Sequence, residues 1–192
     1  MPKLLLISFF LFTIPAAAAA AGVASNDLLI TRPGEKSAII RYYVHGASGG
    51  PSQGIYEVAK ASVTDSSPTQ FGQLSVLDCT ITADYDENST ELGHVQGMMM
   101  SADRRERAMA MVVNVVFTAG PYNGSSLSVL GRNPLEITTG RVLPIAGGSG
   151  TFLMARGYVL ENTYSFDPVE NSFVMNNTAY VYYGDYTSVR GS

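Results

Sequence analysis

The chain contains a single cysteine, no tryptophan and only two histidines among its 192 residues. Because Cys79 is the only thiol, the chain cannot form an intramolecular disulfide or a cysteine-based metal or redox site. Cys79 lies among strand-forming residues, and we expect an inert thiol in the core. His45 and His94 stand far apart in the sequence, without the spacing of zinc ligands. We therefore expect no bound metal and no cofactor.

Charged residues are also scarce. They make up 15% of the sequence, and the formal net charge is −4. The densest basic segment, residues 104–107, is interrupted by Glu106. A protein that binds nucleic acid needs a basic face, because phosphate contacts supply much of the affinity. The composition therefore argues against a nucleic-acid partner.

Long hydrophobic runs are absent as well. The apolar run at residues 4–12 is shorter than the roughly 20 residues of a membrane-spanning helix. It follows Lys3 and precedes a block of alanines, which is the pattern of a secretory signal peptide. We expect cleavage after Ala21 or Ala24, so that residues 1–24 are the signal peptide and residues 25–192 form one domain. The predicted mature protein is secreted and has no membrane span.

Three Asn-X-Ser/Thr triplets fit the secretory route. They begin at Asn88, Asn123 and Asn176, and each is an acceptor for an N-linked glycan. We expect all three asparagines in surface loops.

β-Branched and aromatic residues recur in short runs separated by turn residues. These runs predict strands, among them residues 38–45, 74–82, 94–103, 112–117 and 126–131. Asn123-Gly124 is the strongest hairpin signal. Gly97, inside a predicted strand, indicates a bulge or a close backbone approach. The pattern favours one all-β domain, either a sandwich or a closed barrel.

The GGSG segment at residues 147–150 raises the question of a phosphate-binding loop. A Walker loop needs a lysine after its last glycine, but Thr151 stands there. A dinucleotide-binding loop needs another glycine spacing and a following helix, whereas a strand-like run follows here. We therefore predict that GGSG is a glycine-rich turn or bulge that leads into a strand.

Segments along most of the chain resemble the motifs of plant dirigent proteins, in the order of that family. They are YYVHG (42–46), FGQLSVLDCTIT (71–82), LGHVQGMM (92–99), VLGRNPLEITTGRVLPIAGGSG (129–150) and PIAGGSGTFLMARGYVL (144–160). The resemblance implies a single eight-stranded antiparallel β-barrel with a pocket in its mouth. Allene oxide cyclases use a related barrel.

The resemblance also implies a function. Dirigent proteins have no oxidase activity of their own. They orient phenoxy radicals made by a separate laccase or peroxidase, and some relatives close an ether ring through a quinone methide. It implies an apoplastic protein that binds a small phenolic, phenylpropanoid-type ligand and assembles as a homotrimer. Two alternatives stay open: an extracellular barrel that binds a ligand or glycan without catalysis, and a cyclase like allene oxide cyclase, which the secretory signal disfavours.

The same resemblance assigns candidate site residues. Arg141 and Asp78 match positions expected to act on the ligand. The expected ligand-binding set adds residues on several motifs: Tyr42, His45, Met98, Met100, Asn133 and Thr163. Gly46 and Asn133 stand where family motifs carry acids, which removes two carboxylates from the expected site.

Overall fold

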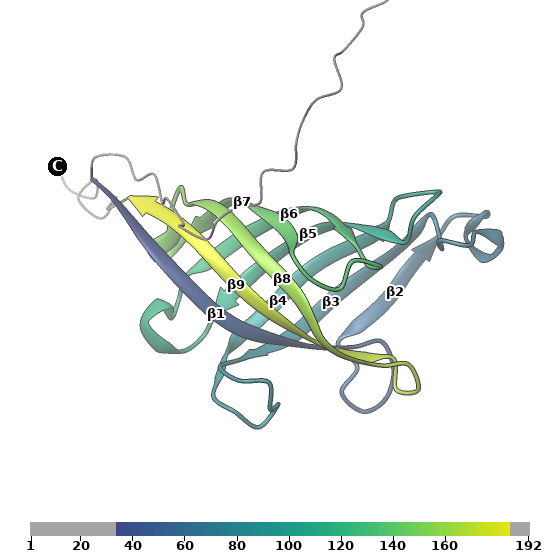
Figure 1. Ribbon diagram of the computed structural model, residues 1–192, viewed down its shortest axis with the longest axis horizontal. Coiled ribbons are helices and arrows are strands. Elements are labelled where there is room, and N and C mark those ends of the chain that lie inside the picture. Colours follow the sequence, from purple (N-terminus) through teal and green to yellow (C-terminus); the bar gives the residue numbers. More distant parts are fainter. Residues whose placement is uncertain (1–33, 185–192) are drawn as a thin grey trace, which may run out of the picture.

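The computed structural model describes residues 34–184, which form an all-β structure (Figure 1). The predicted signal peptide at 1–24 lies outside the described residues. The strands are β1 (Glu35–Ala47), β2 (Ile55–Lys60), β3 (Gln73–Thr82), β4 (Glu91–Ser101), β5 (Ala108–Phe117), β6 (Ser126–Pro134), β7 (Arg141–Ser149), β8 (Arg156–Asp167) and β9 (Ser172–Gly184). Three short 3-10 turns connect them: η1 (Thr64–Ser66), η2 (Gly120–Tyr122) and η3 (Gly150–Phe152). No helix in this part of the chain is long and apolar enough to cross a membrane.

The strands close into a barrel. The sheet runs β1-β9-β8-β7-β6-β5-β4-β3-β2, and an additional β1–β3 pairing joins its two sides. β3 uses Thr80–Thr82 to pair with β1 and its first half to pair with β2. Eight strands therefore form the closed antiparallel wall, and β2 extends beyond it at one end (Figure 1). This confirms the predicted eight-stranded barrel.

Successive side chains along each strand point alternately into the barrel interior and out from its wall. The interior core contains Ile40, Ile81, Val115, Leu127, Val159 and Val181 among its buried residues. Cys79 belongs to the same core and is 2% exposed. Burial raises the pKa of its thiol to about 12, so the thiol stays protonated and inert, as predicted.

The predicted hairpin joins β5 to β6. Asn123 (φ −48°, ψ 132°) and Gly124 (φ +80°) occupy the centre of a type II turn, which the Ser125 N–H closes on the Tyr122 carbonyl at 3.0 Å. Gly124 is needed there because its φ is positive.

The GGSG segment also forms the predicted bulge and turn. Gly147 and Gly148 lie near the end of β7, after a register shift opposite Ser128 and Val129, and Gly150 opens η3. A Cβ at Gly148 would lie 2.4 Å from the Ser126 carbonyl oxygen, so the two backbones approach closely. The next strand begins only at Arg156.

Candidate functional site

A row of polar side chains faces the barrel interior. Arg141 on β7 lies opposite Glu161 on β8, Glu161 lies opposite Asn177 on β9, and Asn177 lies opposite Tyr42 on β1. Cross-strand partners point to the same face, so one inward residue in each of four neighbouring strands builds the row. All four are buried. With Asn133 on β6 and Thr163 on β8, we name them the interior polar cluster.

Glu161 is the centre of this cluster. Arg141 Nη2 lies 3.1 Å from Glu161 Oε1, and the two side chains are 1% and 10% exposed. Asn133 Nδ2 donates to Glu161 Oε1 at 2.8 Å, and Asn177 Nδ2 lies 3.5 Å from Oε2. A buried carboxylate is tolerated when charge and hydrogen bonds compensate it, and both are present here.

Arg141 also reaches towards the mouth of the barrel. Its Nη2 donates to Thr163 Oγ1 at 3.0 Å and contacts Met175 Sδ at 3.2 Å. The guanidinium is thus held in a fixed orientation by groups on β8 and β9. A fixed guanidinium presents its remaining N–H groups in defined directions.

Three buried polar atoms in the cluster have no partner. They are Asn133 Oδ1, Asn177 Oδ1 and Arg141 Nε. Unpaired buried polar atoms are uncommon in folded proteins, because each one costs the free energy of its lost hydration. Two acceptors and one donor are therefore available to a hydroxyl-bearing ligand or to ordered water.

The Tyr42 hydroxyl belongs to the same interior. Burial raises the pKa of its phenol well above the usual value. A hydrogen bond with the Asn177 side chain opposes this shift, and the negative charge of Glu161 adds to it. Tyr42 therefore stays neutral at physiological pH.

The cluster contacts the methionine-lined end of the barrel through Met175. Inward apolar side chains on this side are only partly buried: Leu77, Met99, Met111, Phe173 and Met175. At the other end of the β4–β5 pair, Phe117 packs against Tyr122 and Phe152, with ring centroids 5.9 and 6.0 Å away. Aromatic rings pack together at that end, and the methionine-lined end leaves apolar surface accessible to a ligand.

The structure brings four of the expected site residues together and separates the other four from them. Tyr42, Asn133, Arg141 and Thr163 are members of the interior polar cluster. The other four lie on the outer wall: Asp78, His45, Met98 and Met100. Only one face of each strand reaches the interior, so these side chains and the cluster occupy opposite faces of the wall.

Asp78 takes part in a polar network on the outside. Its carboxylate accepts a hydrogen bond from Gln96 Nε2 at 3.0 Å and lies 2.9 Å from His94 Nδ1. Asp78 and His94 help to line a shallow groove of about 450 Å³, together with Gln53, Gly54, Tyr56, Val76, Leu77 and Thr80. Within the described ranges, no group of three or more acidic, histidine or cysteine side chains is arranged to hold a metal ion.

His45 has a structural contact on the outer wall. The Thr82 hydroxyl donates to the Asp84 carbonyl at 2.6 Å, so it accepts from His45 Nε2 at 2.7 Å. Burial lowers the pKa of His45, and the nearby Glu87 and Asp86 oppose that shift. The neutral imidazole fits this role of joining β1 to the end of β3.

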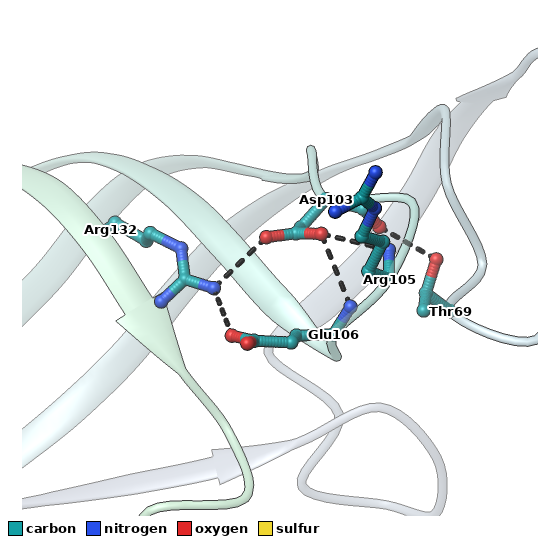
Figure 2. Close-up of polar contacts among 5 residues, drawn as sticks. All are labelled: Thr69, Asp103, Arg105, Glu106 and Arg132. Carbon is teal, nitrogen blue, oxygen red and sulfur yellow. Dashed lines mark hydrogen bonds and ion pairs between the residues drawn. The ribbon is translucent and has the colours of Figure 1, made fainter.

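An ion-pair network fixes the strand that carries Asn133. Figure 2 shows Arg132, the preceding residue, joined to Asp103 and Glu106 of the β4–β5 turn. Asp103 also accepts from the backbone N–H groups of Arg105 and Glu106, and its carbonyl accepts from Thr69 Oγ1 at 2.7 Å. Arg132 and Asn133 point to opposite faces, so the outer network holds β6 in register while Asn133 faces the cluster.

Sequence reasoning missed three inward residues: Glu161, Asn177 and Met99. The signal for them is the two-residue period. Val159, Glu161 and Thr163 alternate with outward residues on β8, and Ala179 predicts the same face for Asn177. On β4, Met98 and Met100 face outward, so the same period places Met99, which lies between them, on the inward face.

The glycan acceptors occupy different environments. Asn88 and Asn123 are exposed in turns, whereas Asn176 lies inside β9 and is half-buried. The loop expectation is therefore wrong for Asn176, because the strand continues through its sequon.

Comparisons with known proteins agree with this architecture. The family model described as Dirigent-like protein matches residues 38–182. Dirigent protein 21 from Arabidopsis thaliana is 33% identical over 184 residues, covering 94% of this chain and 97% of the relative. Pterocarpan synthase 1 from Glycyrrhiza echinata is 30% identical over 149 residues, covering 78% and 79%.

A solved structure extends the likeness to three dimensions. The structure of the pterocarpan synthase dirigent protein GePTS1 aligns with a TM-score of 0.73 and 29% identity, covering 79% of this chain and 92% of that one. Family model, sequence relatives and barrel architecture agree, and the chain therefore belongs to the dirigent-like protein family.

Proposed function

We propose that this dirigent-like protein binds phenylpropanoid-type radicals or quinone methides in the mouth of its barrel and imposes stereoselectivity on their coupling or ring closure. The observation that carries the proposal is the interior polar cluster beneath a partly exposed apolar lining. The protein makes no radicals itself in this proposal. A separate laccase or peroxidase supplies them.

The geometry suits orientation of a small phenol. The mouth offers Leu77, Phe173 and methionines to an aromatic ring, and sulfur makes favourable contacts with ring edges. Arg141 and Thr163 offer fixed polar groups to a phenolic or carbonyl oxygen. Holding a reactive intermediate in one orientation exposes one face to attack and shields the other.

The same proposal includes an extracellular, glycosylated trimer. The predicted signal peptide and the exposed acceptors Asn88 and Asn123 support secretion. For assembly, the outer wall carries one apolar row across five neighbouring strands: Tyr56, Val76, Met98, Val112 and Leu130. We name it the outer apolar row. Such a continuous surface is typical of an interface between subunits.

The test is a coupling assay with an external oxidant. Laccase oxidises coniferyl alcohol with and without the purified protein, and chiral chromatography resolves the products. We expect an enantiomeric excess with the protein and no change in the rate of alcohol consumption. Thr163→Val, which removes the hydroxyl beside Arg141, should reduce that excess.

A second arm tests ring closure without oxidant, using a phenolic quinone-methide precursor. Faster closure to one enantiomer would assign the cyclisation branch of the proposal. Racemic product in both arms, together with saturable phenol binding, would contradict the proposed function and leave an extracellular binding barrel.

A further inference from the structure

Arg141 and Glu161 are the only charged residues that are buried within residues 34–184. They face each other across β7 and β8, and their charged atoms lie 3.1 Å apart. The interior of the barrel therefore contains one positive and one negative charge in contact, and its net charge is zero.

This balance decides what the arginine can do. An unpaired guanidinium inside an apolar barrel would attract anionic ligands strongly, because the low dielectric amplifies its charge. Here Glu161 already forms an ion pair with Arg141, and it also accepts a hydrogen bond from Asn133. A carboxylate ligand would have to displace Glu161 or lie beside it as a second buried anion.

The unpaired polar atoms of the cluster also favour a neutral ligand over a carboxylate. Among the buried atoms that have no partner, Asn133 Oδ1 and Asn177 Oδ1 are acceptors and Arg141 Nε is a donor. A neutral hydroxyl fits such a set because it donates one hydrogen bond and accepts others, whereas a carboxylate only accepts.

Resting on the proposed function, we infer that Glu161 makes this site selective for neutral phenolic ligands and excludes phenolic carboxylates. Glu161 acts here as a specificity-determining residue through charge compensation. The phenol of Tyr42 is buried in the same row and stays neutral. The interior therefore already accommodates one neutral phenol group.

Binding titrations at pH 7 with methyl ferulate and ferulate test the inference, since these probes differ chiefly in the charge of one end. The wild-type protein should bind ferulate at least about tenfold more weakly than the ester, because a second buried anion is unfavourable. Glu161→Gln should improve ferulate binding at least about tenfold, since Arg141 is then free to pair with it. The ester should change by less than about threefold, because it carries no charge to compensate.

The double variant Arg141→Gln/Glu161→Gln is the matched control. It restores a neutral interior, so ferulate binding should become weak again. Thermal unfolding establishes that each variant is folded. If Glu161→Gln does not fold, the wild-type comparison between ester and acid still decides the question.

Equal binding of ester and acid by the wild-type protein would overturn the inference, and so would unchanged ferulate binding in folded Glu161→Gln. Both results leave the proposed function intact if coniferyl alcohol coupling is still biased. Absence of binding by either probe, together with racemic coupling, would instead remove the proposed function and this inference with it.

Discussion

At the scale of single residues, the Arg141–Glu161 pair is a buried ion pair inside an apolar core. Burying two charges costs hydration free energy, and their attraction together with hydrogen bonds from Asn133 and to Thr163 offsets that cost. Removing only one partner would leave the other charge buried without compensation.

Arg141→Met should therefore destabilise the protein by about 3–5 kcal/mol, because Glu161 would remain buried as an unpaired carboxylate. The double variant Arg141→Met/Glu161→Leu should recover most of that loss. Guanidinium unfolding of the single and double variants measures both effects. A double variant as unstable as the single one would contradict the pairing described here.

Four of the eight expected site residues face the interior and four face outward, and the reason is physical. The motifs placed Arg141, Thr163, Tyr42 and Asn133, which the structure gathers in one cluster. The same motifs gave no way to tell the inward face of a strand from the outward face where both carry similar residues. Neighbouring residues of a strand point to opposite faces, so an error of one position places a side chain on the wrong face. On β4 it is therefore Met99, and not its neighbours, that faces inward.

At the scale of elements, close strand crossings depend on glycines. Gly97 on β4 has φ +150°, and a Cβ there would lie 2.3 Å from the Val112 carbonyl oxygen and 2.8 Å from Val113 Cα. The predicted close backbone approach at this glycine is confirmed.

Gly97→Ala should destabilise the fold by about 2–4 kcal/mol, since backbone must shift on β5 and the φ is unfavourable for alanine. Gly147→Ala is the matched control: it is a β-strand glycine whose added Cβ would meet nothing within 4 Å. Urea unfolding compares the two. Equal effects of the two substitutions would contradict the crowding argument.

At the same scale, the β4–β5 turn predicts how the stability of the fold depends on pH. Hydrogen bonds from the Arg105 backbone and then the Arg132 side chain lower the pKa of Asp103 from 3.8 to about 2. A carboxyl with a lowered pKa in the folded state stabilises that state above its unfolded pKa. This contribution is lost as the pH falls from about 4 to about 2.

Asp103→Asn should lower the unfolding temperature at neutral pH and flatten its decline between pH 4 and 2, because the titrating group is gone. Unfolding temperatures of both proteins across that pH range measure the difference. Parallel curves would show that Asp103 does not contribute to the acid sensitivity.

Strands were predictable from local sequence, but closure was not. β-Branched runs predicted the segments of β1 and β3, yet the pairing of Tyr43–His45 with Thr80–Thr82 joins distant parts of the chain. Composition alone left a sandwich and a barrel open, because both use the same alternating strands. Only the family resemblance selected the barrel.

At the scale of the whole molecule, the outer wall exposes a continuous row of apolar side chains. The members of the outer apolar row are 38% to 53% exposed, and they are adjacent across β2 to β6. Burial of this row between subunits would remove it from water, which is the physical reason for the proposed trimer.

Met98→Glu should convert the proposed trimer to monomers, because it places a charge in the middle of the buried face. Met154→Glu serves as its control, since Met154 is 72% exposed in the turn before β8 and lies outside the row. Light scattering after size exclusion gives the masses. A monomeric wild-type protein would contradict the assembly proposal.

The enantiomeric excess of laccase-driven coniferyl alcohol coupling tests the central claim, that the barrel interior imposes stereochemistry. It should be compared between the wild-type protein, Arg141→Gln/Glu161→Gln in the interior and Asp78→Asn on the outer wall. We predict a clear excess with the wild type, its loss in the interior variant and its retention in Asp78→Asn. Loss of the excess in Asp78→Asn with retention in the interior variant would contradict the interior site.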